Sequence, residues 1–184
     1  MALDIGSTKV CALIATIGPG GKVEVIGKGI ATHKGARKGA IIDVPATVEA
    51  IKKATEEAEL MAGARIDRAV VGVAGPQVRS FNSRQVVAVS AKSREISRED
   101  IARSLDAARS SPIPAEFEIL HVLKREFVVD GQDGVSDPLG MVGSRLEADV
   151  HVVTVPVSTT QNIMACVNRA GIEVIELVLE PLAA

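Results

Sequence analysis

The chain has 184 residues, of which 47% are hydrophobic and 24% charged, a balance typical of a globular protein. Its net charge of −2 provides no basic field for nucleic acid, and the absence of Trp and Tyr removes stacking platforms for single-stranded bases, so no nucleic-acid partner is expected. No apolar run is long enough to span a bilayer, and the N-terminus shows no signal-peptide pattern. These features predict a cytoplasmic protein.

A short polar turn near the N-terminus is the first candidate site. Residues 3–9 read LDIGSTK, in which an apolar strand reaches Asp4, small residues follow, and a second apolar strand begins. Gly6 permits unusual backbone dihedrals, and successive amides in such a turn can form an anion-binding nest to which Ser7 and Thr8 add hydroxyl groups. Asp4 suits a water-bridged Mg²⁺, because magnesium keeps its waters and accepts a carboxylate. The alternative is an ordinary polar turn built from the same residue types.

The first part of the chain is predicted to form a three-strand meander. Residues 10–17 are apolar on both faces, which predicts a sheet covered on both sides. The third strand, over 22–32, contains the sequence GKG at 27–29, which indicates a bulge or a close-packing position. The basic loop over 33–39 is interpreted as a solvated connection.

A helix is predicted over 44–62. Asp43 is its expected N-cap, Pro45 lies in the first turn where no N–H is needed, and Gly63 is the expected C-terminal cap. The nearly continuous apolar run that follows, over 68–75, is predicted to add to the sheet as a parallel strand.

After Gly75-Pro76 the pattern changes to that of an inserted module. The expected elements are a strand over 79–90, a helix over 97–110, a strand over 117–130, a loop over 131–143 and a strand over 145–155. Ser97 and Asp100 have capping-box spacing at the start of the helix. The last strand alternates apolar and polar residues, which predicts one buried face and one solvated face. The module therefore reads as strand–helix–strand–strand.

The pattern of the first part returns after Pro156. Ser158 and Gln161 form a second expected capping box, and the helix they begin should end before Gly171. A buried strand is predicted over 172–179, with a further helix beginning at 180. The three histidines of the chain share no spacing typical of a metal site.

This order of elements resembles the N-terminal half of the actin/Hsp70-type, ribonuclease H-like nucleotide-binding fold. Within that superfamily the chain is similar to the bacterial cell-division FtsA family. The resembling stretches are LDIGSTKV at 3–10, GARKG at 35–39 followed by Asp43, EAELMAG at 57–63, ILHV at 119–122, PLGMVG at 138–143, RLE at 145–147 and VH at 150–151.

The resemblance implies an α/β fold with an actin-type core and an inserted α+β SHS2 (strand-helix-strand-strand) module. Residues 1–78 would form the first part of subdomain 1A, residues 79–156 the inserted module, also called 1C, and residues 157–184 the return to subdomain 1A. The second lobe and the membrane-binding helix of the family would lie beyond this chain. The apolar surface that meets the second lobe would then be exposed.

The resemblance also implies a function. FtsA binds ATP and Mg²⁺ between two lobes, forms actin-like filaments, links FtsZ to the membrane through a C-terminal helix absent here, and recruits other divisome proteins. That places the chain in the cytoplasm, peripherally at the inner face of the cell membrane at the division site. With only one lobe, the chain alone is expected to bind ATP weakly or not at all.

Carried onto this sequence, Asp4, Gly6, Ser7, Thr8 and Lys9 would hold phosphates and Mg²⁺, with Asp4 reaching the metal through water. Residues 180–184 resemble the connecting segment at the end of the fifth core strand. Their first residue, Glu180, would position a water near the γ-phosphate, which implies at most a weak ATPase.

Two other interpretations remain open at this point. One is half of a sugar or acetate-type kinase of the same superfamily, in which the Asp4 loop serves phosphoryl transfer. The other is a stand-alone protein-interaction module with a vestigial phosphate loop. Phosphoryl transfer to sugars would distinguish the first, and nucleotide binding by a longer chain would distinguish the second.

Overall fold

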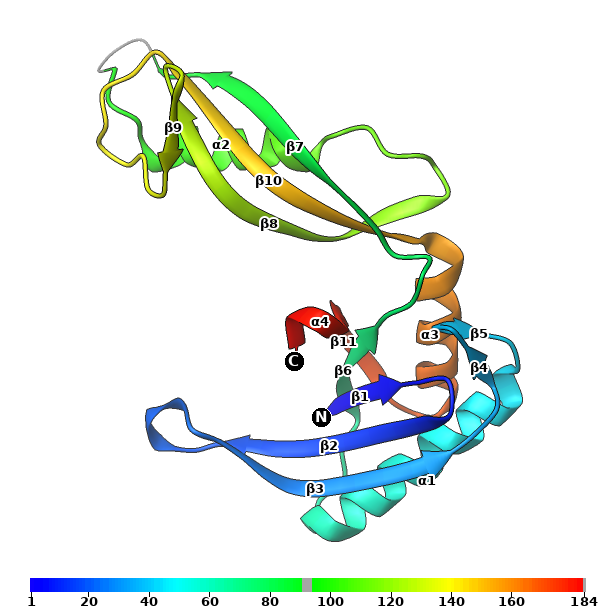
Figure 1. Cartoon of the computed structure of the whole chain (residues 1–184). Coiled ribbons are helices and arrows are strands. Elements are labelled where there is room, and N and C mark those ends of the chain that lie inside the picture. Colours follow the sequence, from blue (N-terminus) through cyan, green and yellow to red (C-terminus); the bar gives the residue numbers. More distant parts are fainter. Residues whose placement is uncertain (91–93, 184) are drawn as a thin grey trace. The chain divides into compact units, whose positions relative to one another are not determined.

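The structure is a computed structural model that describes residues 1–90 and 94–183. It contains two compact units, which are described separately (Figure 1). The core unit consists of Met1–Val78 and the chain from Val155 onward, and the inserted unit consists of Arg79–Thr154.

The core unit is built on a five-stranded sheet with strand order β11-β6-β1-β2-β3. Its strands are β1 (Ala2–Ile5), β2 (Lys9–Ile17), β3 (Val23–Thr32), β6 (Arg68–Val73) and β11 (Glu173–Leu179). The pairs β1–β2 and β2–β3 are antiparallel, whereas β6 pairs parallel with both β1 and β11. The predicted meander and the parallel addition of the fourth strand are confirmed, and the unit has the expected actin-type topology.

Helices α1 (Val44–Ala62) and α3 (Val157–Arg169) touch each other and pack against the sheet. Helix α1 has the predicted ends: an Asp43 carboxylate oxygen accepts a hydrogen bond from the Ala46 N–H at 2.9 Å, and Gly63 adopts a left-handed conformation with φ 68°. Short elements complete the unit, namely the 3-10 turn η1 (Pro19–Gly21), β4 (Ala36–Arg37), β5 (Ala40–Ile41) and α4 (Glu180–Ala183).

Helix α3 begins earlier than the sequence predicts. Pro156 is its N-cap residue, and no side chain caps the helix, so the predicted capping box of Ser158 and Gln161 is wrong. The cause is that β10 continues directly into the helix, which leaves Ser158 inside the first helical turn.

Two glycines allow α1 to lie very close to β3. A Cβ atom at Gly29 would stand 1.9 Å from the Ala54 carbonyl oxygen, and one at Gly27 would stand 2.3 Å from the Ala58 carbonyl oxygen. Ordinary side chains cannot occupy these positions, because the clashing atoms belong to the helix backbone. The interpretation of residues 27–29 as a close-packing feature is confirmed. The close approach also explains why α1 has small residues, Ala54 and Ala58, where it faces β3.

The expectation of a sheet covered on both sides is wrong for β2 within the described residues. Val10, Ala12 and Ile14 are buried, but Leu13 on the alternate face is 37% exposed. On the neighbouring strand β3, Ile30 on that face is also exposed. Apolar residues on both faces of a strand therefore predict what the strand can bury, but not that a second layer is present.

The inserted unit has one more strand than predicted. Its elements are β7 (Arg79–Ala88), α2 (Arg98–Arg109), β8 (Phe117–Val129), β9 (Gln132–Val135) and β10 (Arg145–Pro156), and its sheet order is β7-β10-β8-β9. The strand β9 lies in the segment predicted to be a loop, where it pairs antiparallel with β8. Gly131 at φ 88° and Gly134 at φ 78° mark the tight backbone of this hairpin.

Helix α2 begins with the predicted capping box. The Ser97 hydroxyl accepts a hydrogen bond from the Asp100 N–H, and the Asp100 carboxylate accepts one from the Ser97 N–H at 3.0 Å. Asp100 is only 1% exposed and also accepts hydrogen bonds from Ser90 and Arg103. These hydrogen bonds, with Ser97 contributing most, hold the pKa of Asp100 far below its ordinary range.

This buried carboxylate predicts an acid-sensitive inserted unit. Because the folded-state pKa is depressed, Asp100 stabilises the unit above its unfolded pKa of about 4, and this stabilisation is lost as the pH falls below that value. In Asp100→Asn we expect the inserted unit to lose about 1–2 kcal/mol at neutral pH and to show a flatter stability profile below pH ~4. Thermal unfolding from pH 3 to pH 7 measures both effects, and an unchanged acid slope would contradict this role.

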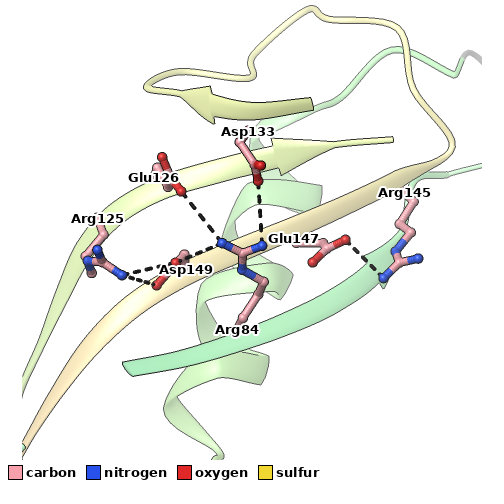
Figure 2. A network of polar contacts seen from close by, with 7 residues as sticks. All are labelled: Arg84, Arg125, Glu126, Asp133, Arg145, Glu147 and Asp149. Carbon is pink, nitrogen blue, oxygen red and sulfur yellow. Dashed lines mark hydrogen bonds and ion pairs between the residues drawn. The ribbon is translucent and has the colours of Figure 1, made fainter. Parts of the chain in front are cut away.

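The polar face of the inserted sheet is not solvated in the way its alternation predicts. Glu147 and Asp149 on β10 are only 8% and 5% exposed. Figure 2 shows arginines beside them, two from the neighbouring strands β7 and β8 and one from β10 itself. Arg84 on β7 and Arg125 on β8 both contact the Asp149 carboxylate at 3.2 Å, and Arg145 contacts Glu147 at 3.0 Å. The prediction of one wet face is therefore wrong for β10.

Candidate functional site

The turn between β1 and β2 places its polar residues at the edge of the open sheet face. Asp4 pairs with Cys11 and is exposed, whereas Leu3 and Ile5 on either side of it are buried. The alternation of a strand therefore directs the Asp4 side chain to the sheet face opposite its buried neighbours.

The turn is closed by its own backbone and by a neighbouring segment. The Gly6 N–H donates to the Lys9 carbonyl oxygen at 3.0 Å, and the Ser7 hydroxyl oxygen accepts from the Lys38 N–H at 2.9 Å. Within the described part of the chain, the backbone N–H groups of Ser7 and Thr8 have no protein acceptor. Two adjacent amides without protein acceptors are what an anion-binding nest requires.

A second carboxylate reaches the turn from the other end of the chain. Glu180 begins α4 directly after β11, is half-buried, and is hydrogen-bonded to the Asp4 side chain. Burial raises the pKa of Glu180, and the nearby charge and hydrogen bond of Asp4 raise it further. A divalent cation placed beside these two carboxyl groups would relieve their mutual repulsion.

The site adjoins a cavity of about 240 Å³ whose lining includes several glycines. It lies among Gly6, Ser7, the Lys38–Gly39 turn, the segment from Gly72 to Gly75, Ile163 and Glu180. A Cβ atom at Gly72 would stand 3.0 Å from the Glu180 side chain, and one at Gly39 would stand 2.0 Å from the Ala74 carbonyl oxygen. Because glycine has no side chain, these positions leave the cavity open and let a ligand approach the backbone.

The structure brings together four of the six residues that the sequence singled out. Asp4, Gly6, Ser7 and Glu180 line this cavity or the adjoining one of about 340 Å³ on the open sheet face. Thr8 lies on the other side of the turn, in a separate hollow of about 500 Å³ with Lys34 and Arg37, and Lys9 is an exposed residue of β2 that pairs with Thr32.

Sequence reasoning missed the residues that complete the cavity. The sequence predicts Gly72 and Gly75 as part of a strand over 68–75, and it predicts a solvated connection over 33–39. The loop instead contacts the β1–β2 turn, because the His33 backbone N–H donates to the Thr8 carbonyl oxygen at 3.0 Å. The glycines of the GARKG stretch were the available signal: Gly39 has φ 75° and touches the residue-74 backbone.

These residues fit a Mg²⁺–phosphate group. The paired carboxylates Asp4 and Glu180 supply oxygen ligands of the kind magnesium prefers, directly or through water. The amides of Ser7 and Thr8 supply donors for phosphate oxygens. Within residues 1–90 and 94–183, no group of three or more metal-ligating side chains is present, so protein ligands alone would not enclose a metal ion.

The described residues contain no helix that is long and apolar enough to cross a bilayer. Of the two cysteines, Cys166 is buried in the core unit, and burial raises the pKa of its thiol. Cys11 is half-buried and lies beside Asp4 at the adjoining cavity.

Comparison with solved structures identifies a similar fold. The chain superposes with a TM-score of 0.64 on a protein of the PilM-PilN type IV pilus biogenesis complex, over 99% of this chain and 47% of that one. Their sequences are 16% identical, so the likeness concerns the fold alone.

Sequence comparison is more specific. Residues 75–154 match the family model described as the SHS2 domain inserted in FtsA. The whole chain is 47% identical to the cell division protein FtsA of Pseudomonas aeruginosa and 41% identical to that of Borreliella burgdorferi. It spans 44% and 45% of those relatives, which is less than half their length. The chain is thus similar to the FtsA proteins over its entire length, and its inserted unit matches the SHS2 domain model of that family.

Proposed function

We propose that the chain is the phosphate-loop lobe of an FtsA-like, actin-family scaffold of bacterial cell division. In this proposal Asp4, the amides of Ser7 and Thr8, and Glu180 hold the phosphates and Mg²⁺ of ATP. Bound nucleotide would favour self-association into filaments that link FtsZ to the membrane and recruit other divisome proteins, at the inner face of the cell membrane.

One observation carries the proposal at the level of chemistry. Glu180, whose carboxyl group is paired with that of Asp4, lines a glycine-rich cavity together with Ser7, whose backbone N–H has no protein acceptor among the described residues. Similarity to FtsA proteins along the whole of this chain supports the cellular role. Lys9 has a lesser part in this proposal, because it is exposed on β2 and does not line the cavity. The chemistry that bound Mg²⁺ supplies is neutralisation of phosphate charge, and Glu180 would orient a water near the terminal phosphate.

The test is a titration of the chain with Mg²⁺–ATP, followed by the amide NMR shifts of Ser7 and Thr8. We expect weak binding, with a Kd of about 1 mM or weaker, because one lobe supplies only part of the contacts. The shift changes should be confined to the turn and the Gly72–Gly75 segment. Submicromolar binding would contradict a half-site, and unperturbed Ser7 and Thr8 amides would contradict the phosphate loop.

Cation binding at the carboxyl pair should depend on pH. Because the pKa of Glu180 is raised, Mg²⁺ must displace a proton, so its affinity should increase by about tenfold per pH unit until that carboxyl group is ionised. In Glu180→Gln this dependence should disappear and Mg²⁺ binding should weaken. The exposed residue Glu176 gives a matched control, since Glu176→Gln removes a carboxylate from β11, the strand that directly precedes Glu180.

The carboxyl groups of Asp4 and Glu180 also predict that, without a cation, the stability of the core unit falls as the pH rises. Without a cation, a raised folded-state pKa means that stability is lost as the pH rises from the unfolded value through the folded one. Glu180→Gln should therefore raise the thermal midpoint of the core unit at neutral pH, whereas Glu176→Gln should leave it unchanged. A lower midpoint in Glu180→Gln would show that the two carboxyl groups do not repel each other.

A further inference from the structure

We propose that His33 is a positioning residue for the phosphate loop, and that it links this loop to the N-terminus of α1 through a fixed, neutral tautomer. The inference rests on the proposed function in one respect, namely that the turn at Gly6–Thr8 binds phosphate. Its structural content, which is the tautomer and the ordering of the loop, is independent of any ligand.

The two ring nitrogens of His33 have different partners. The Nε2 atom lies 2.9 Å from the Gly6 carbonyl oxygen, and the Nδ1 atom lies 3.2 Å from the Gly35 backbone nitrogen. A carbonyl oxygen can only accept, so Nε2 must carry the proton. A backbone N–H can only donate, so Nδ1 must present its lone pair. Both contacts are satisfied together only by the neutral Nε2–H tautomer.

The contacts continue from His33 to the helix. The Gly35 carbonyl oxygen accepts from the Ile42 N–H at 2.8 Å and from the Asp43 N–H at 3.0 Å. Asp43 is the N-cap of α1, and its carboxylate accepts from the Ala46 N–H. A continuous series of hydrogen bonds therefore connects the Gly6 carbonyl group, through the imidazole, to the first turn of α1.

The segment between His33 and α1 has little freedom to move away. A Cβ atom at Gly35 would stand 2.4 Å from the Thr47 hydroxyl oxygen and 2.7 Å from the Asp43 carbonyl oxygen. Gly35 and Ala36 are buried, and His33 itself is half-buried. Because Gly35 is packed directly on the helix, its N–H group holds the Nδ1 atom of His33 in one place. The imidazole ring in turn fixes the position of the Gly6 carbonyl group.

The position of this carbonyl group decides the orientation of the phosphate loop. The Gly6 peptide carbonyl belongs to the same peptide plane as the Ser7 N–H, so a hydrogen bond to the carbonyl oxygen also orients that amide. Two further contacts of the loop come from the same 33–43 segment: the Lys38 N–H donates to the Ser7 hydroxyl oxygen, and the His33 backbone N–H donates to the Thr8 carbonyl oxygen. Loss of the His33 contact should therefore leave the loop in place but release the orientation of its amides.

The direct test is the ¹⁵N NMR spectrum of the His33 imidazole in the unmodified chain, without nucleotide. We expect the shift pattern of a neutral ring protonated on Nε2. A ring protonated on Nδ1, or a mixture of the two tautomers, would overturn the proposal.

Three variants separate the two contacts of the ring. Gln places an amide donor near the Nε2 position, so His33→Gln should keep the bond to Gly6. Asn places an acceptor near the Nδ1 position, so His33→Asn should keep only the bond from Gly35, and His33→Leu should lose both. Hydrogen exchange of the Gly6 amide, whose N–H donates to the Lys9 carbonyl oxygen within the turn, should accelerate about tenfold in the Asn and Leu variants and remain near the original rate in Gln. Equal rates in all three would contradict a positioning role.

The control for a merely structural effect is the helix itself. Exchange in the middle of α1 and the thermal midpoint should change little in the Gln and Asn variants, and a general loss of protection would contradict a role confined to the loop.

A separate titration with Mg²⁺–ATP distinguishes failure of the proposed function from failure of the inference about His33. If Mg²⁺–ATP perturbs no amide of the loop while the tautomer and exchange results hold, the proposed function fails and the inference about His33 stands. If ATP perturbs the loop but the ring carries its proton on Nδ1, the inference alone fails.

Discussion

A single methyl group at position 29 should separate α1 from the core sheet. In Gly29→Ala the new Cβ would stand 1.9 Å from the Ala54 carbonyl oxygen and 2.8 Å from the Ala58 nitrogen, both of which are helix backbone atoms. Neither a rotamer change nor a side-chain shift relieves such a clash, so the helix must move as a body. We expect a loss of about 3 kcal/mol or more from the core unit, or failure of that unit to fold.

The composition of the chain offers a way to assign this effect to one unit. The three Phe residues, which are its only aromatic residues, all lie in the inserted unit at positions 81, 117 and 127. Their near-UV circular dichroism therefore reports on the inserted unit alone, whereas hydrogen exchange in α1 reports on the core unit. In Gly29→Ala, protection in α1 should collapse while the Phe signal persists.

Gly18→Ala is the matched control, because its Cβ would meet its nearest neighbour at 3.6 Å, an ordinary contact. It should change stability by no more than about 0.5 kcal/mol. The double change of Gly29→Ala with Ala54→Gly should not restore stability, since the clash involves the Ala54 carbonyl oxygen rather than its side chain. Recovery in that double variant would show that side-chain packing, and not backbone proximity, limits position 29.

Local signals were sufficient to predict the elements of the core unit. Helix α1 was predicted with both ends correct, because Asp43, Pro45 and Gly63 determine its ends through contacts within a few residues. The capping box of α2 was predicted for the same reason. Strand β9 was missed because four residues that include a glycine have no strand pattern of their own, and only pairing with β8 forms the strand.

The candidate site could be predicted only in part, for a related reason. The β1–β2 turn is local, so Asp4, Gly6 and Ser7 were identified from their spacing. The resemblance supplied Glu180, but the sequence does not show that its carboxyl group touches Asp4, because that contact depends on the parallel pairing of β1, β6 and β11. Likewise, the contact between His33 and Gly6 joins residues that no periodicity relates.

The second large effect is expected at Asp149, in the polar network of the inserted sheet (Figure 2). This carboxylate has a side-chain exposure of 7% and contacts Arg84 and Arg125, whose side chains are 45% and 49% exposed. Asp149→Ala leaves two guanidinium groups facing each other without their shared partner, across strands β7 and β8. Because the arginines are half-exposed, we expect a loss of about 2–3 kcal/mol, less than for a fully buried pair. Thermal loss of the near-UV Phe signal measures it.

The network itself supplies the control. Asp133 on β9 also pairs with Arg84, at 3.6 Å, but its side chain is 70% exposed. Asp133→Asn should therefore cost no more than about 0.5 kcal/mol, because exposed ion pairs contribute little.

The remaining question is whether the charges at Asp149 stabilise the sheet or merely compensate one another. Combining Asp149→Leu with Arg84→Met and Arg125→Met removes all three charges. If burial of the carboxylate is what makes its partners necessary, this triple variant should be more stable than Asp149→Ala. A triple variant less stable than Asp149→Ala would instead assign the network a net stabilising role.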